Sequence, residues 1–214
     1  MKIRTHRQSG FSLLEVCVVL VLLALLVVAV LSALSRTSQR PAGIICMNNL
    51  KQTGLSFRLW SNDHGDQFPW ASTNSAGTFA LANSPQVFRH FLAVSNELVS
   101  PKILACPTDT AQKRVTDFTK FSNANLSYFV ALDADQTKPN RLLSGDRNII
   151  GGNLSNGFLR LLNPSQNDAN WTSAMHNNYG NVGLADGSTT QTSPQWLRDQ
   201  LQRDTLPIIR LAIP

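Results

Sequence analysis

The sequence predicts an α+β protein in which one long N-terminal transmembrane helix carries a globular head with an antiparallel β-sheet. Three observations lead to this prediction. An uninterrupted apolar run covers residues 11–34, a second helical pattern follows it, and most of the remaining chain consists of short strand-like segments separated by turn signals. With 214 residues, 43% of them hydrophobic and 15% charged, the chain has room for one anchor and one folded domain.

The first element is a basic leader followed by an apolar helix. Residues 11–34 span about 36 Å as a helix, which is enough for a hydrocarbon core of roughly 30 Å. The run is too long for a secretory signal peptide and is not closed by a small-residue cleavage site, so we expect it to stay in the mature protein. Three basic residues precede it: Lys2, Arg4 and Arg7. We therefore expect a cytoplasmic N-terminus and an exported head.

Glu15 is the only carboxylate in the apolar run. Because an unpaired carboxylate in a membrane is costly, such an acid indicates a functional role. Cleavage after Gly10 would free the amine of Phe11, one helical turn from Glu15. In a bundle of such helices, the acid of one subunit can neutralise the amine of its neighbour. The alternative is an acid close to the interface that reaches the lipid headgroups.

The segment Gly10-Phe11-Ser12-Leu13-Leu14-Glu15 resembles the type IV prepilin cleavage and methylation motif. The resemblance implies that a prepilin peptidase cuts after Gly10, that Phe11 is N-methylated, and that Glu15 guides assembly. It also implies other partners: pilin or pseudopilin subunits, an inner-membrane assembly platform with its ATPase, and membrane lipid. The implied location is the bacterial inner membrane, single-pass, with a periplasmic or extracellular head that joins a filament.

The chain is expected to have four parts, namely a leader (1–10), a transmembrane or filament-core helix (11–34), a continuation of that helix (35–62) and the exported α+β head (63–214). The cluster Arg40-Pro41-Ala42-Gly43 predicts a kink or break in the continuation. Helical spacing resumes over residues 44–62, with an apolar stripe suited to packing on a sheet.

In the head, the patterns predict a short helix near residues 85–94, a turn at 106–109 and a second helix at 194–204. The expected strands are 127–132, 148–150, 158–162, 181–185 and 188–192, with 208–212 as an edge strand that closes the sheet. Asp186-Gly187, between two of these strands, is the strongest hairpin signal in the chain.

Cys46 and Cys106 both fall in the part expected to be exported, where disulfides are permitted. We predict that they pair; the alternative is two buried thiols.

A second resemblance lies in the head. His176 is followed, after nine residues, by Asp186-Gly187, which matches the H-X9-DG signature of prepilin-type proteins from planctomycetes and verrucomicrobia. The segments Cys46–Gln52, Cys106-Pro107 and Leu143–Asn148 are similar to that group as well. Physically, Gly187 supplies the positive φ of a tight turn. We expect His176 to brace this turn by bonding to its backbone or to Asp186, with a metal or catalytic role as the alternative.

No phosphate-binding loop, zinc-protease helix, serine-hydrolase elbow or paired C-x-x-C motif is present in the sequence. We therefore predict that the protein is not an enzyme and needs no cofactor. Similarity to the major pseudopilins of type II secretion adds one exception, a calcium site with Asp133, Asp135 or Asp186 as ligands. The formal charge of +6 depends partly on the leader and is too weak to predict nucleic-acid binding.

These observations favour a structural subunit of a type II secretion or type IV pilus-type filament. One alternative is a minor pilin of a DNA-uptake or twitching system, which a basic and aromatic face on the head would favour. Another is a membrane-anchored enzyme or sugar-binding domain that uses the same export signal. A deep polar pocket around His176, Asp146 and Asp186 would favour that alternative.

Overall fold

The computed structural model describes residues 13–37 and 39–214, with side chains described for 13–31 and 43–214. It divides into two compact units, Met1–Pro41 and Ala42–Pro214. The second unit begins inside a helix, so the segment after Ala42 belongs to the head. The sequence-based boundary at residue 63 is therefore placed too late, because one face of this helix forms part of the head's core.

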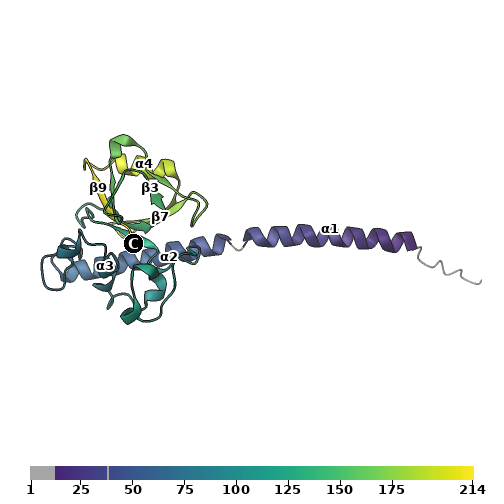
Figure 1. The fold of residues 1–214 in the computed structure, drawn as a ribbon, viewed down its shortest axis with the longest axis horizontal. Helices are drawn as coiled ribbons and strands as arrows, with labels where there is room; N and C mark the ends of the chain where they lie inside the picture. The colour runs from purple at the N-terminus through teal and green to yellow at the C-terminus, as the bar shows by residue number, and fades with distance from the viewer. Residues whose placement is uncertain (1–12, 38) are drawn as a thin grey trace, which may run out of the picture. The chain divides into compact units, whose positions relative to one another are not determined.

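The first unit contains the helix α1 (Leu13–Thr37), drawn in purple in Figure 1. Within it, Leu13–Leu31 is long and apolar enough to cross a membrane, and none of that stretch is buried inside the structure. The α+β class predicted from the sequence is confirmed by this helix together with the sheet of the head.

The second helix, α2 (Gln39–Asp63), is helical through Arg40–Gly43, so the break expected inside that cluster is not found there. Pro41 instead lies in the first turn, where a missing backbone N–H is tolerated. The helix turns one face inward, and Leu50 and Phe57 on that face are fully buried. Phe57 packs on Trp70 and Phe91, with ring centroids 5.1 and 5.3 Å apart. The predicted apolar stripe of this helix is thus confirmed at Leu50 and Phe57.

Between α2 and the sheet, the chain forms short helical turns and loops. They are η1 (Phe79–Leu81), α3 (Phe88–Leu92), η2 (Pro101–Leu104), η3 (Phe118–Lys120) and η4 (Asn123–Asn125). The helix predicted near residues 85–94 is therefore present, in the shortened form α3. Its Phe91 is fully buried in the same core as Phe57.

The main sheet has seven strands in the order β4-β5-β9-β1-β2-β7-β8, and the pairings are antiparallel. In that order the strands are Asn153–Ser155, Leu159–Leu162, Ile209–Ala212, Tyr128–Ala131, Leu142–Asp146, Gly180–Leu184 and Thr189–Thr192. A second sheet pairs β3 (Ile149–Ile150) with β6 (Asn170–Trp171). Two further helical segments are η5 (Pro164–Gln166) and α4 (Pro194–Gln202), and Figure 1 labels α4 together with β3, β7 and β9 of the head.

The Asp186-Gly187 hairpin is confirmed: it joins β7 to β8, and Gly187 has a φ of 86°. The prediction of an edge strand at 208–212 is wrong. β9 lies between β5 and β1, with Ala212 paired to both Leu159 and Val130. This central place follows from burial, because Leu211 and Ala212 are fully buried.

Candidate functional site

The N-terminal segment carries the processing and assembly residues predicted from the sequence. Gly10 and Phe11 lie outside the described residues, and Glu15 lies in the first turn of α1. The large apolar side chains of this helix are exposed in the single chain, by between 47% for Val30 and 84% for Leu13. A helix that is apolar on its whole circumference must be covered by lipid or by other apolar helices.

The disulfide joins Cys46 in α2 to Cys106, which follows η2. The two Cα atoms lie 5.2 Å apart across a sequence separation of 60, so the structure contains the predicted pair. Both cysteines are buried. The bond ties the first turns of α2 to the Cys106–Asp109 turn, in which the Asp109 N–H donates to the Cys106 carbonyl.

His176 contacts this disulfide instead of the hairpin turn. Its Nε2 lies 3.5 Å from Cys106 Sγ, 3.0 Å from Asn181 Nδ2 and 3.3 Å from Asp146 Oδ2. The expected contact with Asp186 is therefore wrong. The turn is held by Asp186 itself, whose Oδ1 accepts from the Ser188 N–H and hydroxyl at 2.8 and 2.6 Å. Because this local bonding holds the turn, no histidine is needed there.

Asp146, at the end of β2, is fully buried. Its Oδ2 accepts from the backbone N–H and the side-chain amide of Asn181 at 2.6 and 2.9 Å, whereas Oδ1 is buried without a partner. Burial raises the pKa of Asp146 to about 7, against the opposing effect of the Asn181 hydrogen bonds. Burial also lowers the pKa of His176. Both shifts disfavour the charged forms of the two side chains, and therefore disfavour an ion pair between them.

An ion pair between Arg147 and Asp109 lies beside this contact. Arg147 donates to both carboxylate oxygens of Asp109, from Nε at 2.6 Å and from Nη2 at 2.8 Å. These bonds raise the pKa of Arg147. The backbone N–H of Arg147 donates to the Ser127 carbonyl, and the Ser127 hydroxyl accepts from the backbone N–H of Cys106. These hydrogen bonds therefore connect the disulfide, the Cys106–Asp109 turn and the end of β2 in one network.

The chemistry available to this cluster is limited. Among the described residues, Cys46, Cys106 and His176 form the one group of metal-ligand side chains whose donor atoms lie within 4.8 Å of one another. Because the two sulfur atoms are bonded to each other, they offer no thiolate to a metal or a substrate. We therefore interpret the cluster as structural.

The three acids considered for calcium do not converge on one point. Asp133 accepts from the backbone N–H of Arg210 at 2.7 Å and pairs with its guanidinium. Asp135 accepts from the N–H and hydroxyl of Thr137, both at 2.8 Å, which lowers its pKa. Asp186 bonds to Ser188. Each carboxylate is thus engaged locally, and the three acids form no joint group within the described part of the chain.

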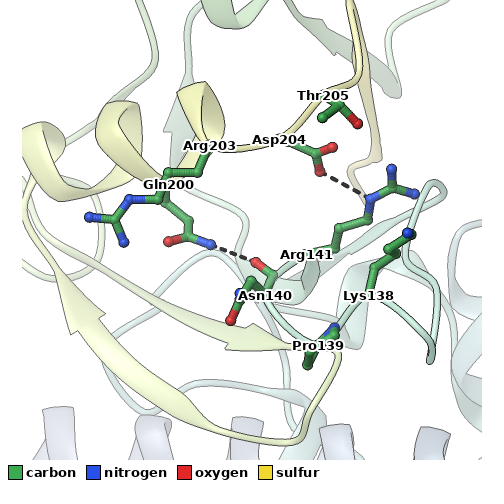
Figure 2. Close-up of a pocket in the computed structure, with 8 residues that line it drawn as sticks. All are labelled: Lys138, Pro139, Asn140, Arg141, Gln200, Arg203, Asp204 and Thr205. Atoms are coloured by element: carbon green, nitrogen blue, oxygen red, sulfur yellow. Dashed lines mark hydrogen bonds and ion pairs between the residues drawn. The ribbon is translucent and has the colours of Figure 1, made fainter.

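A separate cavity of about 230 Å³ lies between the connection from β1 to β2 and the end of α4 (Figure 2). We call it the α4 pocket; it is lined by Lys138, Pro139, Asn140, Arg141, Gln200, Arg203, Asp204 and Thr205. Sequence analysis missed it because two segments separated along the chain form it. No local motif marks either segment.

Comparison with known proteins identifies a family motif in one part of the chain. The family model for the prokaryotic N-terminal methylation motif matches residues 5–31, which include Gly10, Phe11 and Glu15. No curated protein and no solved structure matches the chain. The chain is therefore type IV pilin-like by its N-terminal motif and its apolar helix.

Proposed function

We propose that this protein is a structural subunit of a type II secretion or type IV pilus-type filament, processed by prepilin peptidase after Gly10. The observation that carries the proposal is the methylation motif at residues 5–31, placed directly on an apolar helix. The same motif supports anchoring in the inner membrane with an exported head. On the residues quoted above, we also propose that the head belongs to the H-X9-DG group.

The exposed surface of α1 supports this function physically. In the membrane, lipid covers the apolar side chains between Leu13 and Leu31. In a filament, neighbouring copies of α1 replace the lipid. Glu15 then lies among apolar helices, where a carboxylate costs free energy unless a neighbour's terminal amine neutralises its charge. The carboxylate therefore favours the assembled state and one axial register.

Processing is tested by co-expression with a prepilin peptidase, followed by intact-mass measurement and N-terminal sequencing. We expect a chain that starts at N-methylated Phe11. The variant Gly10→Val should stay uncut, because a branched side chain replaces the glycine before the cleaved bond. An uncut wild-type chain, with the peptidase active on a control prepilin, would overturn the proposal.

Assembly is tested with Glu15→Ala. We expect normal cleavage and a large loss of filaments in the sheared fraction, because the terminal amine loses its partner. Cys17→Ala serves as the matched control in the same helix and should assemble normally. A normal filament yield from Glu15→Ala would contradict the pairing argument while leaving the processing result intact.

A further inference from the structure

We propose that the head binds single-stranded DNA on a surface formed by α3 and the loops around η3. This inference goes beyond the filament role and does not depend on assembly. We call the surface the basic face; it consists of four cations and two aromatic rings, namely Arg89, Lys113, Arg114, Lys120, Phe88 and Phe118.

The positive charge of the head is concentrated on the basic face. The unit from Ala42 to Pro214 has 14 basic and 12 acidic residues, a net charge of +2. Four of those basic residues belong to the basic face, and Asp117 is the one acid in residues 110–125, so together they carry +3. The remaining ten basic and eleven acidic residues of the head sum to −1. The modest net charge of the head therefore conceals a local excess of cations.

The four cations can meet an external anion. All four are exposed, and none of them forms an ion pair within the described part of the chain. The carboxylate of Asp117 accepts from the Thr119 N–H at 2.9 Å, at the start of η3. The next acid along the chain, Asp109, is paired with Arg147. Exposed cations of this kind bind phosphate groups and release the counterions of a nucleic acid.

The segments that carry the cations meet at one place in the head, within the teal part of the ribbon in Figure 1. The backbone N–H of Phe88 donates to the Asn123 side-chain oxygen at 2.9 Å. The backbone N–H of Lys113 donates to the Ala124 carbonyl at 3.0 Å, and the Asn125 amide donates to the Lys113 carbonyl at 2.8 Å. These bonds bring the start of α3 and the start of the 113–120 segment against the turn that follows η3.

Two partly exposed rings lie among these cations. Phe88 and Phe118 each contact the edge or face of Phe121, with ring centroids 6.2 and 5.9 Å apart. Phe121 is only 5% exposed, whereas the other two rings are partly accessible. The Cζ atom of Arg89 lies over the Phe88 ring, 5.6 Å from its centroid. The buried ring therefore holds the two outer rings in place beside the basic side chains.

The rings decide which polyanion suits the face, because cations alone would suit any of them. Proteins bind single strands by combining a positively charged surface with aromatic rings and guanidinium planes on which bases stack. An acidic polysaccharide has no aromatic base, and the bases of a duplex are stacked on one another. Apolar rings can also pack on the C5-methyl group of thymine, which uracil lacks. These properties favour single-stranded DNA.

Binding is tested by fluorescence anisotropy with the full chain in phosphatidylcholine nanodiscs. The probe is a labelled oligothymidylate of about 12 nucleotides, a length that one single-strand-binding domain covers. An abasic strand of the same length keeps the phosphates and removes the bases. We expect the oligothymidylate to bind at least about tenfold more tightly than the abasic strand, the effect of one stacked base. Equal binding of the abasic strand, or tighter binding of a duplex or an oligouridylate of that length, would overturn the proposal.

Salt dependence and variants locate the binding surface. The slope of log affinity against log salt should decrease in magnitude by about 0.7 for each cation removed. We expect this change in Lys113→Gln and in Lys120→Gln, but not in Lys138→Gln, an exposed lysine outside the basic face. An unchanged slope in both face variants would overturn the assignment.

A ring variant separates base stacking from charge. Phe118→Leu keeps an apolar side chain at this position and removes the aromatic ring. It should weaken binding of the oligothymidylate by about tenfold and leave binding of the abasic strand unchanged. Thermal unfolding of the variant checks that the head still folds. Unchanged oligothymidylate binding, or an equal loss for both strands, would contradict stacking on this ring.

Discussion

Asp146, which lies beside His176 in the core, is the clearest case of a residue whose environment controls its protonation. Asp146 is fully buried and one of its oxygens has no partner, so its charged form lacks both water and sufficient donors. Its pKa of about 7 means that the folded protein retains a proton that the unfolded chain releases at much lower pH.

This proton links stability to pH. Because the folded-state pKa of Asp146 lies above its unfolded value, its contribution to stability is complete below pH 3.8 and is lost as the pH rises through about 7. Asp146→Asn keeps a neutral isostere at all pH values. We therefore expect the variant to exceed the wild type in unfolding free energy at pH 8 by more than about 1 kcal/mol, and to lose this advantage at pH 4.

Urea unfolding of both proteins at the two pH values measures this difference. His176 has a lowered pKa and acts in the opposite direction below about 6.5, but it is present in both proteins. Asp199→Asn on the exposed face of α4 is the matched control and should show no such pH dependence. A pH-independent difference between wild type and Asp146→Asn would contradict the raised pKa.

At the scale of elements, the disulfide attaches α2 to the rest of the head. Closing a loop across a separation of 60 residues stabilises a fold by about 4 kcal/mol on the chain-entropy model. We expect the Cys46→Ala, Cys106→Ala double variant to lose stability of that order, measured by denaturant unfolding. Cys17→Ala in α1 should leave the midpoint unchanged, and reductant should destabilise only proteins that retain the pair. Equal midpoints with and without reductant would contradict this role.

The central place of β9 has its own energetic consequence. Leu211 is fully buried between neighbouring strands, so Leu211→Ala should destabilise the head by about 2–5 kcal/mol. Ile208, just before β9, is 46% exposed, and Ile208→Ala should cost far less. Thermal unfolding of both variants measures the contrast. Similar small losses at both positions would indicate an edge strand after all.

At the scale of the whole molecule, the leader charges are expected to decide on which side of the membrane the head folds. Replacing Lys2, Arg4 and Arg7 with Glu removes the positive-inside signal. The head should then stay in a reducing compartment, where Cys46 and Cys106 do not pair. Alkylation under denaturing conditions should label one cysteine in the wild type and three in the variant, as read by mass. Labelling of one cysteine in both would refute this orientation argument.

The sequence by itself was sufficient for the apolar helix, the prepilin motif, the part of α2 after residue 43 and the Asp186-Gly187 hairpin, but not for the start of α2. These features depend on signals between close neighbours: a continuous apolar run, helical spacing, and a glycine at a position that requires positive φ. Local physics determines them, so they can be predicted without knowing what lies next to them in space.

Only the tertiary structure decided the position of β9, the partners of His176 and the α4 pocket. Strand order depends on which distant segments pair. The C-terminal segment, predicted as an edge strand, is the central strand β9 because β5 and β1 pair with it on either side. His176 meets Asp146 and Cys106 because β2, β7 and the Cys106 turn converge in the core. The pocket likewise arises where α4 ends beside Arg141. Such contacts join residues far apart in the chain, and no local pattern encodes them.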